Sequence, residues 1–356
     1  MPPASQTLAL LGDSWVRGSG LPFAATGRAP TYFVPELARA LRERFGDAGG
    51  GWCGLSYTTS SERRGGAAEP DRFSQTGTGS WRTHVRHQPT PDLCTSTSDT
   101  PGDLIRVTWR GDATSCVVLH AFAGGAINYR WNGGPWHGLT LGGMPGQSRY
   151  ALLDFPVEGA WELDIAVAQG TVTLAGIEHR ADAPGIRIHN LGAGGSSTAD
   201  WLAAARSGAW FAGLHALAID SAVLLLGTND QRDLDAAQYR ANLGEIVDRM
   251  RVQLPSLRLT LACSPENSDD APQRRTRPML AYQEAAAAVA ARHGLAMVDL
   301  QPVFGDVADY GHHGTRPLLD ASRLHPNAAG GAVLRERMMA ACLALLTPPP
   351  DCVTRR

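Results

Sequence analysis

The second half of the chain alternates apolar runs of strand length with runs of helix length. Strand-like runs occur at 186–191, 222–226, 257–262 and 295–300, and helix-like runs at 201–205, 234–254, 280–293 and 328–346. This alternation predicts a parallel sheet with helices on both faces. We assign a further apolar run at 7–12 to the same sheet. A helix is also expected at 31–45, where Leu37, Leu41 and Phe45 repeat at intervals of four.

Helical periodicity is absent between about Ser60 and Ala183. Short runs rich in β-branched and aromatic residues are separated there by glycine-rich turns, and they cover 104–109, 116–122, 127–131, 150–155, 161–167 and 171–179. Many short strands at close spacing predict a β-sandwich or jelly roll. We therefore expect one α/β domain formed by residues 1–58 and 184–356, with residues 59–183 inserted as a β-sandwich module.

This middle stretch holds five of the nine tryptophans: Trp81, Trp109, Trp131, Trp136 and Trp161. Aromatic side chains in a small β-module usually form its core. Alternatively, some of them form a platform for a sugar, because an aromatic face matches the apolar C–H face of a pyranose. The stretch is therefore a candidate carbohydrate-binding module.

Charge and hydropathy bear on the partners and on the location of the protein. The formal net charge of −2 gives no reason to propose nucleic acid or an anionic membrane. No apolar run is long enough to span a bilayer. The N-terminal residues MPPASQ lack the charged and apolar segments of a signal peptide. Either the protein stays in the cytoplasm, it leaves by another route, or the sequence lacks its leader.

The six cysteines do not form a Cys-x-x-Cys pair, so zinc binding and dithiol redox chemistry are not indicated. Two of them, Cys116 and Cys263, lie in apolar strand-like runs and are expected to be buried thiols. The remaining four either form disulfides in an oxidising compartment or stay reduced, and the candidate pairs are Cys53–Cys94 and Cys342–Cys352.

Four polar motifs fall at the ends of predicted strands or just before the last helix. They are GDS at 12–14, NLGAGGSS at 190–197, GTND at 227–230 and DASRLHPN at 320–327. Reacting groups of an open α/β sheet lie at the carboxyl ends of its strands, so these motifs are expected to meet at one edge. Each alone is more often a turn or a helix cap than a catalytic element. All four in this order favour a site.

Acyl transfer by a serine needs a nucleophile, a base, an acceptor that orients the base, and donors for the oxyanion. Ser14 can supply the nucleophile, and His325 the base, because an imidazole titrates close to neutral pH. Gly195 offers a backbone N–H with no side chain in the way, and Asn229 offers a carboxamide N–H. The sequence therefore predicts a serine esterase.

The four motifs resemble the SGNH, or GDSL, hydrolases. That family has Gly-Asp-Ser near the N-terminus, a glycine after the second strand, Gly-x-Asn-Asp after the third, and Asp-x-x-His-Pro near the C-terminus. The resemblance covers residues 7–58 and roughly 184–346. It implies a flavodoxin-like three-layer α/β/α fold and a Ser-His-Asp esterase that needs no metal or cofactor. It also implies an oxyanion hole formed by the N–H groups of Ser14 and Gly195 and the side chain of Asn229.

One position departs from the family pattern. The aspartate of the family lies three residues before the histidine, where this chain has Ser322, whereas Asp320 lies five residues before. Either the loop brings Asp320 to Nδ1 of His325, or Ser322 or a backbone carbonyl orients the imidazole and the triad is effectively a dyad. We favour Asp320 as the third member of the triad.

The glycine-rich stretch at 45–52, followed by a β-module, is similar to a subgroup of these enzymes that removes O-acetyl groups from polysaccharides, including peptidoglycan. We therefore expect hydrolysis of small acyl esters, acetyl above all, on a carbohydrate. The alternatives are a lipase or thioesterase that acts on longer acyl chains, an O-acetyltransferase, and a glycan-binding protein with a vestigial esterase core. The sequence leaves the oligomeric state open.

Overall fold

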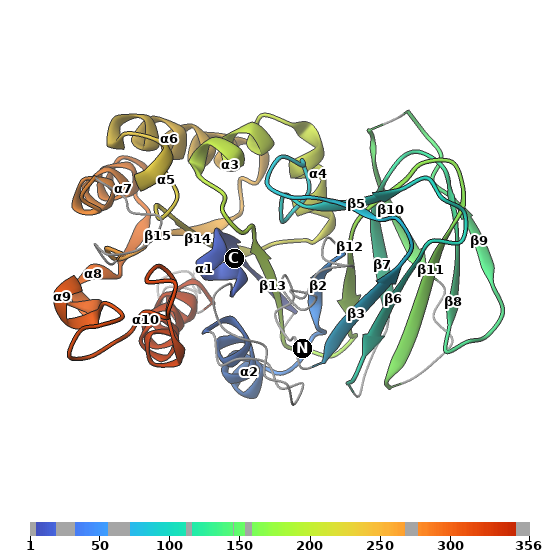
Figure 1. Ribbon diagram of the computed structural model, residues 1–356, viewed down its shortest axis with the longest axis horizontal. Coiled ribbons are helices and arrows are strands. Elements are labelled where there is room, and N and C mark those ends of the chain that lie inside the picture. Colours follow the sequence, from blue (N-terminus) through green and yellow to red (C-terminus); the bar gives the residue numbers. More distant parts are fainter. Residues whose placement is uncertain are drawn as a thin grey trace, which may run out of the picture.

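The computed structural model describes residues 5–18, 33–55, 72–111, 116–144, 146–153, 159–267 and 277–346. Within these residues the strands form one parallel sheet and two antiparallel sheets. The parallel sheet and its helices lie on the left in Figure 1, and the antiparallel sheets lie on the right.

The parallel sheet has the strand order β13-β1-β14-β15-β16, and every neighbouring pair in it is parallel. Its strands are β1 (Gln6–Gly12), β13 (Ile186–Gly192), β14 (Ser221–Leu226), β15 (Arg258–Cys263) and β16 (Ala296–Asp299). In chain order this is 2-1-3-4-5, the flavodoxin-like arrangement. The prediction of a parallel α/β sheet that includes the N-terminal strand is confirmed.

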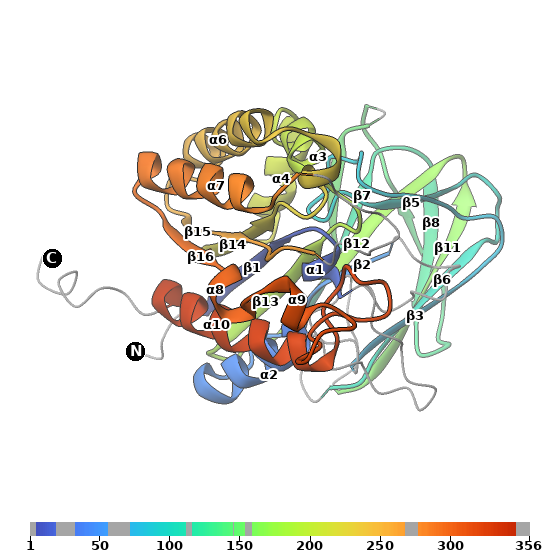
Figure 2. The ribbon, with the colours of Figure 1, turned by 60° about the vertical axis from the view of Figure 1, so that its left-hand side comes forward.

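Helices cover both faces of the parallel sheet (Figure 2). One face carries α3 (Thr198–Ala205), α4 (Gly208–Ala216), α6 (Ala236–Gln253) and α7 (Leu280–His293). The other carries α1 (Ser14–Arg17), α2 (Phe33–Phe45), α8 (Gln301–Phe304), α9 (Val307–Tyr310) and α10 (Ala328–Leu346). Side chains of β1 alternate between the two cores: Ala9 and Leu11 join the first, and Leu8 and Leu10 join the second. This alternation explains why the strand is apolar throughout.

One expected helix begins later than the sequence prediction. The helix expected at 234–254 begins only at Ala236, because Asp235 caps it: its carboxylate accepts the Gln238 N–H at 2.8 Å. A separate short helix, α5 (Asp230–Asp233), precedes it. The helix expected at 31–45 is described from Phe33 onward, and residues 31 and 32 lie outside the described ranges.

The first antiparallel sheet has the order β10-β7-β12-β5-β4, with β2 paired to β12, and the second has the order β3-β6-β11-β8-β9. Their strands are β2 (Gly51–Gly54), β3 (Phe73–Thr78), β4 (Arg82–His84), β5 (Thr95–Ser98), β6 (Leu104–Trp109), β7 (Cys116–Phe122), β8 (Ala126–Trp131), β9 (His137–Thr140), β10 (Ser148–Leu153), β11 (Trp161–Gln169) and β12 (Val172–Arg180). Residues from both sheets share one hydrophobic core. Strand β2 precedes residue 59, yet it pairs with β12 inside the stretch 59–183.

Four of the five tryptophans of this region are core residues, namely Trp81, Trp109, Trp131 and Trp161. Trp136 is different, because it is 44% exposed and the guanidinium of Arg130 lies 4.4 Å from its ring centre.

The described cysteines carry thiols, so no disulfide joins Cys53 to Cys94. Cys263 and Cys342 are buried, whereas Cys116, expected to be buried, is only partly so because it begins β7; Cys352 lies outside the described residues. Among the helices described here, none has the length and apolar character needed to cross a membrane.

Candidate active site

The site begins at the carboxyl end of β1, the strand that lies between β13 and β14 in the parallel sheet. Gly12 stands opposite Gly192 on one side and Leu225 on the other. A Cβ at Gly12 would lie 2.3 Å from the Leu225 carbonyl oxygen and 2.6 Å from a methyl of Val16, so only glycine fits this turn. The loops that follow these three strands therefore leave the sheet at one edge.

Ser14 is the first residue of the short helix α1, directly after this turn. The Asp13 carboxylate accepts the Trp15 N–H at 2.9 Å and so caps the helix. Ser14 is 5% exposed. Its N–H donates no hydrogen bond within the described part of the chain, as is usual for the first turn of a helix. A developing negative charge beside this serine would meet an available donor.

His325 lies beside Ser14, with 2.9 Å between its Nε2 and the serine Oγ. It is held by a loop whose two ends pair with each other. The Asn327 N–H donates to the Leu318 carbonyl and the Asp320 N–H to the His325 carbonyl, each at 2.8 Å. A hydroxyl and an imidazole within hydrogen-bond distance are the geometry of an activated nucleophile.

Asp320 and Ser322 lie on the Nδ1 side of the imidazole. Ser322 Oγ is 3.1 Å from His325 Nδ1. The Asp320 carboxylate accepts hydrogen bonds from the Ser322 N–H, at 2.9 Å, and from the Ser322 hydroxyl. The structure thus places Ser322 against the ring and Asp320 behind Ser322.

Gly195 and Asn229 lie in the loops after β13 and β14. Gly195 has a φ of +76°, in the left-handed region that favours glycine, and no described residue accepts its N–H. Asn229 is 3% exposed, and its Nδ2 donates to the Ser196 carbonyl at 2.9 Å. This bond ties the two loops together. Both candidate oxyanion donors therefore belong to the edge of the sheet that carries Ser14.

Asp230 has a structural function that the motif did not reveal. Its carboxylate accepts the Thr198 N–H at 2.8 Å and the Thr198 hydroxyl at 2.5 Å. It thereby joins the loop after β14 to the first residue of α3. Burial raises the pKa of Asp230 to about 7.

The loop between β4 and β5 brings residues of the antiparallel region to this edge. Arg86 donates to the Gly195 carbonyl at 3.4 Å, and His87 Nδ1 lies 3.1 Å from an Asp200 carboxylate oxygen. Arg86 has a φ of +73°, and no carboxylate of the described residues pairs with its guanidinium. No periodicity or motif in the sequence marks this loop, so sequence reasoning missed it.

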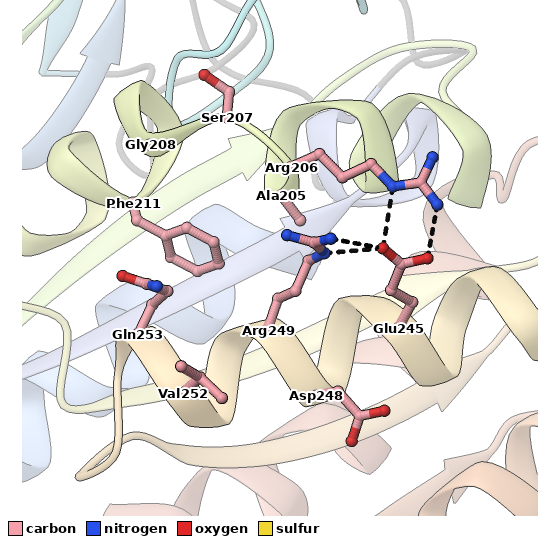
Figure 3. A pocket seen from close by; sticks show the side chains of 10 residues that line it. All are labelled: Ala205, Arg206, Ser207, Gly208, Phe211, Glu245, Asp248, Arg249, Val252 and Gln253. Atoms are coloured by element: carbon pink, nitrogen blue, oxygen red, sulfur yellow. Dashed lines mark hydrogen bonds and ion pairs between the residues drawn. The ribbon is translucent and has the colours of Figure 1, made fainter.

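A separate pocket of about 430 Å³ lies between α3, α4 and α6 (Figure 3). Glu245 there accepts hydrogen bonds from Arg206 and Arg249, which hold its pKa at about 2. The pocket contains none of the candidate site residues, and its charges are paired. The ranges that the structure describes hold no group of three or more His, Cys, Asp or Glu residues suited to a metal ion.

Comparison with known proteins supports an esterase core. Residues 171–333 match the family model described as GDSL-like Lipase/Acylhydrolase. This match includes Gly195, Asn229 and His325, and Ser14 lies before it. No curated protein sequence matches the chain.

Among solved structures, a peptidoglycan O-acetylesterase is similar over 96% of this chain and 92% of its own, with a TM-score of 0.70 and 17% identity. An acetylxylan esterase from Geobacillus stearothermophilus is 24% identical, covers 44% of this chain and 72% of its own, and has a TM-score of 0.35. The first likeness spans the parallel and the antiparallel sheets alike. Together with the family match, it identifies the parallel sheet and its helices as the SGNH hydrolase fold.

Proposed function

We propose that this chain, whose residues 171–333 match the GDSL-like Lipase/Acylhydrolase family model, is a carboxylic ester hydrolase that removes O-acetyl groups from a carbohydrate. The observation that carries the proposal is the 2.9 Å contact between Ser14 Oγ and His325 Nε2. This contact lies at the carboxyl edge of the parallel sheet. The loops after β13 and β14 leave the sheet at the same edge and carry the proposed donors Gly195 and Asn229.

In the proposed mechanism, His325 Nε2 takes the Ser14 proton while Oγ forms a bond to the ester carbonyl carbon. The carbonyl oxygen becomes an oxyanion that accepts hydrogen bonds from the N–H groups of Ser14 and Gly195 and from Asn229 Nδ2. The C–O bond to the sugar then breaks, and the alcohol leaves with the proton from His325. Water attacks the acyl-serine while His325 takes its proton. The bond between the acyl carbon and Ser14 Oγ then breaks, Oγ regains the proton from His325, and acetate leaves. Asp320 is the acidic member of the triad.

The antiparallel region supports the choice of a carbohydrate. We propose that residues 59–183 are an inserted β-sandwich that shapes the cleft and holds the glycan. Two features favour this. Arg86, in the loop between β4 and β5, donates a hydrogen bond to the Gly195 carbonyl, and residues of the same β4–β5 loop line a groove of about 620 Å³. The lining of this groove includes His84, Gln88, Phe122 and Thr173. One structural neighbour that matches over 96% of this chain, with a TM-score of 0.70, is named as a peptidoglycan O-acetylesterase.

The proposal is tested by measuring acetate release from O-acetylated xylan and O-acetylated peptidoglycan, with p-nitrophenyl acetate, butyrate and octanoate in parallel. We expect turnover of an acetylated glycan, a preference for acetate over octanoate, and no turnover by Ser14→Ala. A preference for octanoate would indicate a lipase or thioesterase. Transfer of acetyl to an added sugar would indicate an O-acetyltransferase, and glycan binding without any ester turnover would indicate a vestigial core.

A further inference from the structure

Ser322 stands where the family pattern has a carboxylate, and its hydroxyl lies between two functional groups. The Asp320 carboxylate accepts a hydrogen bond from this hydroxyl, and His325 Nδ1 lies 3.1 Å on its other side. The backbone N–H groups of Leu324 and His325 each point to the same oxygen at 3.3 Å. Four neighbours thus fix the position of one hydroxyl oxygen.

The direction of these hydrogen bonds follows from the groups involved. A carboxylate can only accept, so the Ser322 proton points to Asp320. The lone pairs of Ser322 Oγ are then left for the N–H donors, and His325 Nδ1 must be one of them. An imidazole that carries its proton on Nδ1 presents a lone pair on Nε2. This is the tautomer that can take the proton of Ser14.

We propose that Ser322 is a positioning residue that connects Asp320 to His325, so that a hydroxyl relays the effect of the carboxylate. The inference rests on the proposed function of Ser14 and His325. During acyl transfer one proton moves, from Ser14 Oγ to His325 Nε2. The Nδ1 proton and the Ser322 proton stay on their atoms, and the hydroxyl, polarised by Asp320, stabilises the imidazolium.

The loop sequence makes this arrangement available. The bond between the Asp320 N–H and the His325 carbonyl closes a six-residue turn, and Arg323 takes a φ of +59° within it. The turn places Ser322 inside and leaves Asp320 one hydroxyl away from the ring. Four residues separate Asp320 from His325, two more than in the family pattern Asp-x-x-His. The side chain of Ser322 bridges the resulting gap between the carboxylate and the imidazole.

A mutant cycle on p-nitrophenyl acetate tests the relay. Ser322→Ala removes a hydrogen bond to a charged group, and we expect this loss to lower kcat about 10- to 150-fold with KM unchanged. We expect Asp320→Ala to cost a similar factor in wild type but less than about threefold in the Ser322→Ala background, because both act through one chain of bonds. Ser322→Thr keeps a hydroxyl and is expected to retain activity within about tenfold of wild type.

The Ser322→Asp variant is the most decisive test of the relay, because it places a carboxylate directly against Nδ1 of His325. In that background Asp320→Ala is expected to cost less than about threefold. If Asp320→Ala costs the same factor in the wild-type, Ser322→Ala and Ser322→Asp backgrounds, the relay is refuted. Full activity of Ser322→Ala would refute it as well. Asp306→Ala is the matched control, since Asp306 accepts the N–H two residues ahead at 2.9 Å, as Asp320 does, but does not contact His325.

The tautomer of His325 gives a readout that does not require ester turnover. We expect ¹⁵N NMR of histidine-labelled protein, assigned with His325→Gln, to show the proton on Nδ1 in wild type and a mixture in Ser322→Ala. A resting His325 with its proton on Nε2 would overturn the relay even in a fully active esterase. Conversely, the expected tautomer in a protein without esterase activity would support the relay and refute the proposed function.

Discussion

Replacing Asn229 with alanine is expected to slow the reaction and to destabilise the protein for two separate reasons. The substitution removes a proposed oxyanion donor, and loss of one such donor typically costs about 3–4 kcal/mol, or a 10²- to 10³-fold lower kcat. It also removes the N–H that the Ser196 carbonyl accepts at 2.9 Å. Ser196 is fully buried, and an unsatisfied buried group costs about 1–3 kcal/mol.

Steady-state kinetics on p-nitrophenyl acetate and thermal unfolding separate the two effects. We expect kcat to fall with little change in KM, because the oxyanion exists only near the transition state, and Tm to fall by a few degrees. Asn242→Ala is the matched control: its Nδ2 donates to Thr198 Oγ1 at 3.3 Å, outside the proposed oxyanion hole. An Asn229→Ala enzyme whose kcat stays within about fivefold of wild type, despite a lower Tm, would refute the oxyanion donor.

Two further predictions concern the surroundings of the site. Burial raises the pKa of Asp230 to about 7 in the folded protein, above the ordinary value of 3.8, so its contribution to stability is complete below pH 3.8 and is lost as pH rises toward 7. Urea unfolding should therefore show Asp230→Asn gaining stability relative to wild type between pH 4 and pH 7, and parallel pH profiles would contradict this. Arg86→Ala should lower kcat/KM on an O-acetylated glycan by roughly tenfold but change p-nitrophenyl acetate hydrolysis less than about threefold, since Arg86 contacts the Gly195 loop from the β-module. Equal losses on both substrates would contradict a function in glycan recognition.

The parallel sheet was predictable because its strands carry their own signal. A continuous apolar run such as 222–226 is stable only when both faces are buried, and the polar motifs that follow such runs must emerge at one edge. That reasoning also grouped Ser14, Gly195, Asn229 and His325.

Several strands of the antiparallel sheets could not be predicted in this way. Strand β5 reads Thr-Ser-Thr-Ser, without an apolar residue, yet Thr95, Ser96 and Ser98 are buried. Two of these buried hydroxyls donate hydrogen bonds: Ser96 to the Leu55 carbonyl at 2.7 Å and Ser98 to Asp103 at 2.6 Å. Strand β2 contains two glycines, and a Cβ at Gly51 would lie 2.2 Å from the Ile188 carbonyl oxygen. Neither pattern resembles a strand in isolation.

The orientation of the imidazole depends on a detail that spacing does not give. From the spacing we favour Asp320 over Ser322 or a backbone carbonyl as the group that orients His325. The answer depends on how a six-residue turn closes and on which side chain its interior holds. In the same way, the approach of Arg86 to Gly195 joins residues 109 positions apart through the packing of two regions.

The central claim is that Ser14 is a nucleophile activated by His325, and covalent labelling tests it most directly. A fluorophosphonate reacts with an activated serine, and mass spectrometry of the digested protein locates the adduct. We predict one adduct, on the peptide that contains Ser14, and a strongly reduced labelling rate in His325→Ala. An adduct on another residue, or an active esterase that the reagent leaves unmodified at Ser14, would contradict the account.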